Sequence, residues 1–171
     1  MSAPVAAAVG LGGNVGDSAR ILLQAFEALE ALPETRMRAC SSLYRTPAWG
    51  LEAQADFSNA AAALETRLPA GELLDALLGI ERDFGRMRAA DGSDRWGPRI
   101  LDLDLLLYGD AVLDAPGMRV PHPHLHERAF ALVPLLEVLP DARIPGVGPA
   151  RDALAVLDAS GVERLTSSPS R

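Results

Sequence analysis

The most informative stretch of the chain covers residues 96–109 and reads Trp96-Gly97-Pro98-Arg99-Ile100-Leu101-Asp102-Leu103-Asp104-Leu105-Leu106-Leu107-Tyr108-Gly109. This apolar run predicts a β-strand that carries two aspartates two residues apart. Side chains at i and i+2 of a strand point to the same face, so we expect the two carboxylates side by side, with Cα atoms about 7 Å apart. The opposite face should hold four leucines, Leu101, Leu103, Leu105 and Leu107.

Two carboxylates in an apolar strand call for a compensating positive charge. Aspartate is depleted in strands, and an unpaired buried carboxylate tends to protonate. Mg²⁺ prefers carboxylate oxygens and is usually held by one or two of them together with substrate phosphates and water. The pair Asp102 and Asp104 therefore predicts a divalent metal site, and the alternative is an edge strand whose polar face is in water.

Length and composition predict one domain over residues 1–164, with a frayed tail over residues 165–171. Cys40 is the only cysteine, so an intrachain disulfide is excluded and a reducing cytoplasm is compatible. The apolar stretch from Val5 to Leu11 has no basic leader and is too short to span a bilayer. We expect a cytoplasmic protein without a membrane partner.

The charges are distributed unevenly along the chain. A net charge of −7 argues against a nucleic-acid-binding role. All 16 basic residues are arginines, so a Walker A loop, which needs a lysine, is excluded. Five arginines against three acids between Arg82 and Arg99 nevertheless predict a site for a small polyanion.

The periodicity predicts strands over residues 5–11, 39–45 and 57–64, although the alanine run of the third would suit a helix. Helices are predicted from Asp17 or Ser18 to Pro33, from Pro69 with Gly85 as the C′ cap, and over residues 127–138 with Pro134 in the middle. Residues 89–95 predict an exposed loop that closes over the ligands, and residues 111–117 a turn. The mixture predicts an α+β fold with a sheet packed by helices.

Several motifs have a plain alternative explanation. Arg86 and Arg88 could complement a helix dipole. The alternating His122, His124 and His126 could suggest zinc, but prolines interrupt them and no cysteine is near. The large aromatic residues could be ordinary core anchors. Taken separately, the motifs therefore indicate no more than Mg²⁺-dependent chemistry on a small phosphorylated ligand.

In combination, the motifs resemble the 6-hydroxymethyl-7,8-dihydropterin pyrophosphokinase family of folate biosynthesis over about residues 5–140. Gly-Pro-Arg-x-Leu-Asp-Leu-Asp is the most specific of them. The segments that carry the resemblance are residues 10–17, 41–47 and 56–60, Glu81 with residues 85–88, residues 96–109, and residues 120–130.

The resemblance implies a ferredoxin-like α+β sandwich with a largely antiparallel sheet flanked by helices. It also implies transfer of diphosphate from ATP to the pterin hydroxymethyl group, with two Mg²⁺ ions and release of AMP. The expected partners are these small molecules, and we expect a monomer.

The family motifs assign roles to individual residues. The implied catalytic set is Arg86, Arg99, Asp102 and Asp104, with the two aspartates as metal ligands. The implied ATP-binding set is Glu81, Arg86, Arg88, Trp96, Arg99, Leu105, His122 and Arg128. The implied pterin-binding set is Thr46, Pro47, Trp49, Phe57, Asn59, Trp96, Asp102 and Phe130. Three positions depart from the family pattern, namely Trp49, Phe57 and Leu78, and Leu78 puts nucleotide affinity in doubt.

Two other classes of function compete with this one. Another two-aspartate metal enzyme, such as a nucleotidyltransferase, would release pyrophosphate in place of AMP. A catalytically silent module would bind ATP without consuming it. The nucleotide product distinguishes all three.

Overall fold

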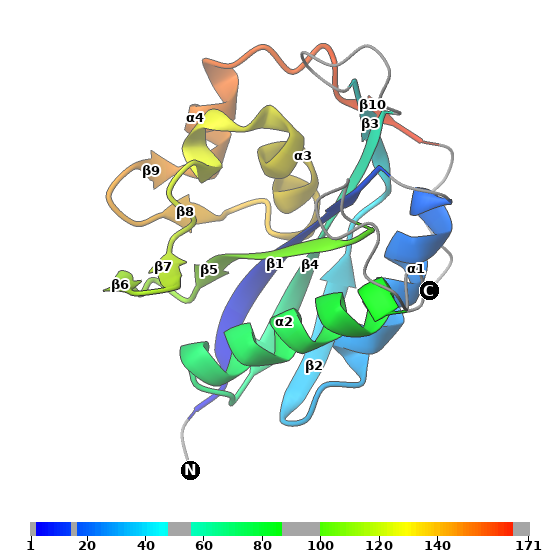
Figure 1. Ribbon diagram of the computed structural model, residues 1–171. Coiled ribbons are helices and arrows are strands. Elements are labelled where there is room, and N and C mark those ends of the chain that lie inside the picture. The colour runs from blue at the N-terminus through cyan, green and yellow to red at the C-terminus, as the bar shows by residue number, and fades with distance from the viewer. Residues whose placement is uncertain (1–2, 15–16, 48–55, 87–99, 166–171) are drawn as a thin grey trace.

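The computed structural model of the protein describes residues 3–14, 17–47, 56–86 and 100–165. Within these residues a six-stranded sheet has the order β10-β3-β4-β1-β5, with β2 also paired to β4 (Figure 1). Its strands are β1 (Val5–Gly13), β2 (Thr35–Cys40), β3 (Tyr44–Thr46), β4 (Phe57–Thr66), β5 (Asp102–Tyr108) and β10 (Glu163–Arg164). Every pairing in this sheet is antiparallel.

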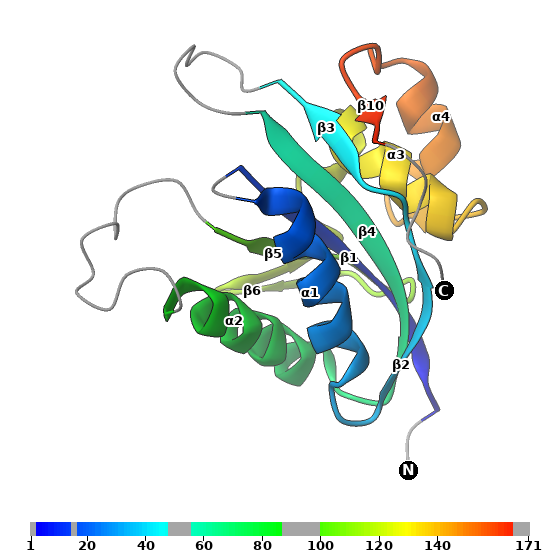
Figure 2. The ribbon, with the colours of Figure 1, turned by 90° about the vertical axis from the view of Figure 1, so that its right-hand side faces the viewer.

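Helices cover both faces of the sheet, which makes three layers (Figure 2). On one face lie α1 (Ser18–Glu30) and α2 (Ala70–Arg86), which connect β1 to β2 and β4 to β5. On the other lie α3 (Ala129–Val138) and α4 (Ala150–Ala155). Two interleaved strand–helix–strand units around an antiparallel sheet form the ferredoxin-like α+β arrangement, so the predicted fold class is confirmed.

Two smaller hairpins complete the described chain. β6 (Leu113–Ala115) pairs with β7 (Met118–Val120), and β8 (Arg143–Ile144) pairs with β9 (Gly148–Pro149). The turn of the first hairpin contains Gly117 with φ +78°, a left-handed conformation that glycine adopts at little cost. A single 3₁₀ turn at Leu125–Glu127 leads into α3.

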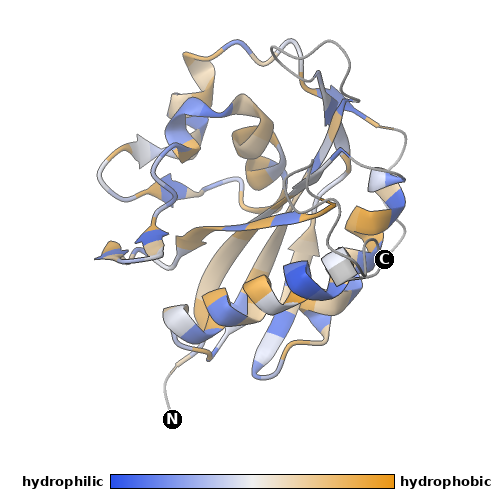
Figure 3. Ribbon diagram, viewed as in Figure 1, coloured by the Kyte–Doolittle hydropathy of each residue, from blue (hydrophilic) through white to orange (hydrophobic). Residues whose placement is uncertain are grey.

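The sheet separates two apolar cores. Alternate residues of the strands pack with α1 and α2 in the larger core, which includes Val9, Leu11, Leu103 and Leu105. The smaller core lies under α3 and α4 and includes Ala8 and Leu135. In Figure 3 the central strands of the sheet are coloured mostly as apolar, whereas α2 carries both apolar and polar residues, as expected for a helix with one buried face.

A β-bulge in β5 changes which face its last residues use. Val9 pairs with Leu105 and Ala8 pairs with Leu107, so Leu106 is an extra residue between the two pairs. Leu107 consequently packs in the core under α3, whereas Leu101, Leu103 and Leu105 pack against α1 and α2. The prediction that Leu107 shares a face with the other three leucines is wrong, because the bulge breaks the period of two.

The strand predicted over residues 39–45 is two strands. After Cys40 the hydroxyl of Ser41 replaces a backbone group: Ala61 N donates to Ser41 Oγ (2.9 Å), and Ser41 N donates to Ala61 O (2.9 Å). Ser42, fully buried, turns toward α3, and β3 begins at Tyr44. Buried serines thus divide the strand without leaving polar groups unsatisfied.

Other predicted elements are confirmed with changes of extent. Asp17 caps α1 by accepting from Arg20 N (3.2 Å), and β4 forms despite its alanine run. α2 continues through Gly85 to Arg86, so the predicted C′ cap is wrong. The predicted turn at 111–117 contains strand β6. The predicted loop at 89–95 and residues 166–171 of the predicted tail lie outside the described residues.

No helix among the described residues is long and apolar enough to cross a membrane.

Candidate active site

The sheet register brings three functional segments together on the face toward α3. Gly12 of β1 pairs with Asn59 of β4 on one side and with Asp102 of β5 on the other. Gly10 pairs with Asp104. Because glycine carries no side chain, β1 forms an open floor between the amide of Asn59 and the two carboxylates. A Cβ atom at Gly12 would approach Asn59 Oδ1 to 3.2 Å, which is a tight contact.

A cavity of about 410 Å³ opens over this floor. The first turn of α3 forms one wall, and the end of β3 forms another. Its lining combines polar groups at the sheet with aromatic and aliphatic side chains, as expected for a site that binds a flat organic ligand. The lining residues are Gly10, Leu11, Gly12, Thr46, Pro47, Phe57, Asn59, Asp102, Asp104, Leu106, His122, Leu125, Arg128, Phe130 and Ala131.

The polar edge of this cavity is organised by a buried hydrogen bond. Asn59 Nδ2 donates to Thr46 Oγ1 (2.9 Å), and both residues are buried. Phe57 and Phe130 contribute the aromatic part of the lining. The Arg128 guanidinium carbon lies 5.7 Å from the centroid of the Phe130 ring, within cation–π distance. One wall therefore offers hydrogen-bonding groups, and another offers an aromatic surface with a positive charge beside it.

A second cavity, of about 350 Å³, lies between α2, β5 and the β6–β7 hairpin. It shares Asp104 and His122 with the first cavity. Glu81, which lines it, accepts from Leu103 N (2.6 Å) and so joins α2 to β5. Its lining residues are Leu74, Leu78, Glu81, Leu103, Asp104, Leu105, Gly117, Met118, Arg119, Val120, His122 and Pro123. Two ligands could thus meet at Asp104.

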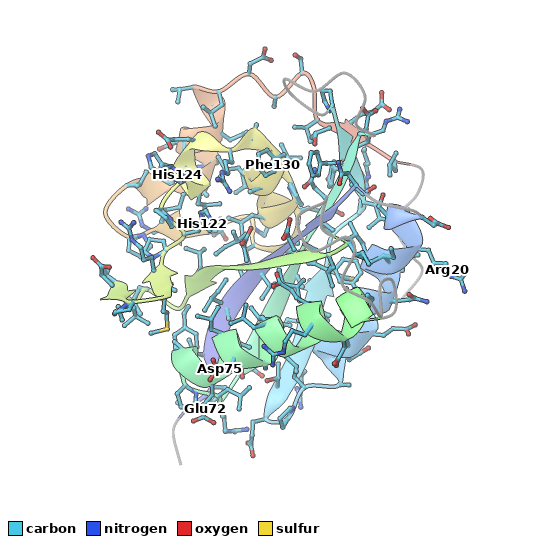
Figure 4. The ribbon with its side chains drawn as sticks, in the orientation of Figure 1. Arg20, Glu72, Asp75, His122, His124 and Phe130 are labelled. Carbon is cyan, nitrogen blue, oxygen red and sulfur yellow. The ribbon has the colours of Figure 1, made fainter. Side chains whose placement is uncertain are left out.

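The β5 bulge holds His122 at this junction. His122 N donates to the carbonyl oxygen of Leu106, the extra residue (3.0 Å). Burial lowers the pKa of His122 below its usual value; the charge of Asp104 opposes this shift, while Arg128 and His124 reinforce it. In Figure 4, His122 and Phe130 lie on the α3 side of β5, and Glu72 and Asp75 lie on the opposite side, on α2.

The alternating histidines, for which a zinc site was disfavoured from the sequence, make other contacts in the structure. His124 Nδ1 lies 2.9 Å from Glu127 Oε1, and this hydrogen bond lowers the pKa of Glu127. The rings of His122 and His124 are 6.3 Å apart. Within residues 3–14, 17–47, 56–86 and 100–165, no three His, Cys, Asp or Glu residues are grouped so as to hold a metal ion.

The two aspartates suit a metal that takes part of its coordination from a substrate. Asp102 and Asp104 are two residues apart in β5, and both line the first cavity. An oxygen-only set of two carboxylates fits Mg²⁺, which commonly completes its shell with phosphate oxygens and water.

The structure brings most of the predicted site residues together. Around the two cavities lie Thr46, Pro47, Phe57, Asn59, Glu81, Asp102, Asp104, Leu105, His122, Arg128 and Phe130. Arg86 is the last residue of α2. Trp49, Arg88, Trp96 and Arg99 lie outside the described residues.

Sequence reasoning missed several lining residues. Gly10 and Gly12 were not among the predicted site residues, although two glycines alternating along a strand are a signal of an open sheet face. Arg119 was missed because residues 111–117 were interpreted as a turn, which hid the hairpin. Leu106 reaches the first cavity through the bulge, Leu125 through the 3₁₀ turn and Ala131 through α3, and no local pattern marks them.

Comparison with known proteins agrees with this geometry. A model of the family described as 7,8-dihydro-6-hydroxymethylpterin-pyrophosphokinase (HPPK) matches residues 8–140. A 2-amino-4-hydroxy-6-hydroxymethyldihydropteridine pyrophosphokinase of Methylorubrum extorquens is 46% identical over 157 residues, which cover 92% of this chain and 96% of that protein. The enzyme of the same description from Pseudomonas aeruginosa is 45% identical over 157 residues, 92% of this chain and 94% of that protein.

Solved structures support the fold. The wild-type HPPK-DHPS of Plasmodium falciparum superimposes with a TM-score of 0.68 at 13% identity, covering 89% of this chain and 44% of that chain. This chain therefore spans less than half of that larger protein, and the likeness at such low identity concerns the fold alone. The sequence matches carry the assignment: the chain is an enzyme and belongs to the 7,8-dihydro-6-hydroxymethylpterin-pyrophosphokinase family.

Proposed function

We propose that this enzyme transfers diphosphate from ATP to the hydroxymethyl group of 6-hydroxymethyl-7,8-dihydropterin, with Mg²⁺ and with release of AMP, as a step of tetrahydrofolate biosynthesis. The observation that carries the proposal is that two cavities of different character share Asp104 and His122. A two-substrate transfer needs its substrates to meet at one point, beside groups that control phosphate charge.

The first cavity suits the pterin. The ring would lie between Phe57 and Phe130, and Asn59 with the chain around Thr46 and Pro47 would bind its hydrogen-bonding edge. The hydrogen bond between Asn59 and Thr46 supports this assignment, because it holds the amide in one orientation before a ligand binds. Trp49 and Trp96 are proposed to complete this site.

The second cavity suits the nucleotide. Glu81 and Leu105 line it, and His122 at the junction lines both cavities. The triphosphate would be bound by His122 and by four arginines, Arg86, Arg88, Arg99 and Arg128. Trp96 is also proposed for this site. The planar guanidinium groups substitute for the lysine that the chain lacks.

Asp102 and Asp104 would hold two Mg²⁺ ions. Bound Mg²⁺ would neutralise phosphate charge and orient the phosphates for attack. The negative charge of the two carboxylates would hold the cations beside the cavities. Asp102 and Asp104 project from the same side of β5 because they lie two residues apart.

The reaction itself requires positioning more than a strong base. The pterin hydroxyl oxygen forms a bond to the β-phosphorus while the bond from that phosphorus to the α,β-bridging oxygen breaks, and the hydroxyl proton leaves to water. The chain's residues align the two substrates in the joined cavities and stabilise the charge on the transferred group with arginines. Asp102, Asp104, Arg86 and Arg99 form the proposed catalytic set.

The proposal includes the setting of the enzyme: a cytoplasmic monomer that acts on two small molecules. The net charge of −7 supports the absence of a nucleic-acid partner.

The test is identification of the nucleotide product. The protein is incubated with ATP, MgCl₂ and the reduced pterin alcohol, and the nucleotides are separated by chromatography. AMP formed in equal amount to pterin diphosphate is expected. Pyrophosphate release would indicate a nucleotidyltransferase, and unchanged ATP would indicate a silent binding module.

A further inference from the structure

A carboxylate on α3 joins that helix to β3 outside both cavities. Glu137 accepts three hydrogen bonds: from Ser42 N to Oε1 (2.9 Å), from Ser42 Oγ to Oε2 (2.9 Å) and from Tyr44 Oη to Oε1 (2.6 Å). We call Glu137, Ser42 and Tyr44 the Glu137 clamp. Arg164 Nη2 of β10 lies 3.8 Å from Glu137 Oε2. None of these residues lines either of the two cavities described above.

The carboxylate of Glu137 is ionised, and hydrogen bonds and a nearby positive charge stabilise it. Burial opposes ionisation of Glu137, but the hydrogen bonds from Tyr44 and Ser42 and the charge of Arg164 outweigh it, so the pKa of Glu137 lies below its usual value. Burial, together with the hydrogen bond to Glu137, raises the pKa of Tyr44 to about 12. Ser42 is fully buried and Tyr44 is 7% exposed, so loss of the carboxylate would leave three donors without this acceptor.

On the strand side, the clamp lies next to the pterin-binding groups. Tyr44 pairs with Asn59 across β3 and β4, and Tyr44 and Thr46 stand two residues apart in β3, so their side chains share a face. Thr46 accepts the hydrogen bond of Asn59. A displacement of Tyr44 would therefore be transmitted directly to the hydrogen-bonding wall of the first cavity.

On the helix side, the clamp lies on the same face as the aromatic wall. Phe130 and Glu137 are seven residues apart in α3, which is about two helical turns. Both side chains therefore project from one side of the helix. Glu137 is bound to β3, and Phe130 lines the cavity that β3 also borders.

From these contacts we infer that Glu137 is a positioning residue that sets the separation between Phe130 and the Thr46–Asn59 wall, and so the fit of the pterin. The inference rests on the proposed function, since it takes the pterin as the ligand of the first cavity. Glu137 touches no substrate. Its loss should weaken pterin binding while leaving the nucleotide cavity, which lies beyond β5, unaffected.

The test compares steady-state constants of full-length variants at 25 °C. Glu137→Ala is expected to raise KM for the pterin about tenfold, the equivalent of about 1.4 kcal/mol, and to change KM for ATP by less than about twofold. Glu137→Gln should return the pterin KM to within about threefold of the wild type, because its amide can still accept from Tyr44 and Ser42 N and can donate to Ser42 Oγ.

A control variant separates positioning from general destabilisation. Thr66→Ala removes a buried hydroxyl that bonds Thr35 Oγ1 (2.7 Å) at the other end of β4, far from the cavities. It should lower the melting temperature with both KM values unchanged. If Glu137→Ala is not folded, Tyr44→Phe removes one clamp bond alone and should raise the pterin KM about threefold.

Three results would overturn the inference: pterin KM unchanged in folded Glu137→Ala or Tyr44→Phe, both KM values raised alike, or the same pterin effect in Thr66→Ala. A wild-type protein that forms no AMP would refute the proposed function and the inference with it. An active wild type without the split in KM values refutes the inference alone.

Discussion

The two faces of β5 differ although the residues that form them alternate along one strand. Leu103 and Leu105 pack against α1 and α2, each 5% exposed. Asp102 and Asp104, their neighbours, face a cavity over a floor of glycines. On the first face leucine side chains fill the space under the helices and also border the second cavity. On the second face the side chains of β1 are absent beside the carboxylates.

This difference shows that the site results from leaving part of one face uncovered. α3 packs over Ala8 and Leu107 and fills that half of the face. Beyond the bulge the same face has glycine, aspartate and asparagine, and α3 reaches only the wall of the cavity there. The packed face provides most of the core, and the open part of the other face provides the first cavity.

The largest expected effect is a contrast between adjacent residues of β5: one substitution should reduce turnover, and the other should reduce stability. Asp102→Ala or Asp104→Ala should reduce turnover by more than tenfold while the melting temperature stays near that of the wild type, because a metal ligand is lost from an open face. Leu103→Ala should instead lower the free energy of unfolding by about 2–5 kcal/mol. Coupled assays and thermal melts check both. More than a tenth of wild-type turnover in an aspartate variant at saturating Mg²⁺ would contradict the metal assignment.

The next largest expected effect is a difference in stability between alanine substitutions at two glycines of β1. A Cβ atom at Gly13 would lie 2.4 Å from the Ile100 carbonyl oxygen, whereas at Gly10 it would meet the Leu106 side chain at 3.4 Å. Gly13→Ala should therefore cost about 3 kcal/mol of stability, because a backbone atom has to move. Gly10→Ala is the matched control for folding, and equal urea midpoints for the two variants would disprove the steric argument.

The two cavities should respond to different substitutions. Asn59→Ala and Phe130→Ala should each weaken pterin binding by about 2 kcal/mol, through a lost hydrogen-bond partner and lost stacking. Their ATP affinity should change little. Arg119→Ala, in the second cavity, should show the reverse pattern. Isothermal titration calorimetry with each ligand measures this, and unchanged pterin affinity in both of the first two variants would remove them from the site.

The smallest expected effect is a pH dependence from the Glu137 clamp. The pKa of Glu137 is lowered by folding, so its contribution to stability is present above its unfolded value of about 4.5 and is lost as the pH falls through the lower folded value. The urea midpoint of the wild type should exceed that of Glu137→Gln at pH 7, and the gap should narrow by pH 3. A gap that is constant with pH would show that the charge of Glu137 does not contribute.

Much of the fold could be predicted because strands and helices here follow simple periods. β1, α1 and α2 have clear apolar patterns, and the paired aspartates of β5 correctly indicated a polar face. β4 formed despite helix-favouring alanines because it is a central strand between β1 and β2/β3, where small side chains pack under helices on both faces.

The errors arose where tertiary contacts override local pattern. The bulge at Leu106 depends on the register with β1. The break after Cys40 depends on buried serines that hydrogen-bond to β4 and α3. For the site, the motifs predicted residues that the structure places around the two cavities, and their roles remain predictions. The sharing of Asp104 and His122 by two cavities was not predictable, because it depends on how the β6–β7 hairpin and α3 approach β5 from different sides.

The pairing of β1 also determines when this enzyme can assemble during synthesis. Its two neighbours, β4 and β5, both come later in the chain, β4 after α1, β2 and β3, and β5 after α2. Gly12 can pair with Asn59 earlier, but its second partner, Asp102, is made only after more than half of the 171 residues. Such long-range pairing slows folding, so refolding in milliseconds to seconds is expected, well behind a helical bundle of the same length. The floor of the active site should then be among the last parts of the molecule to close.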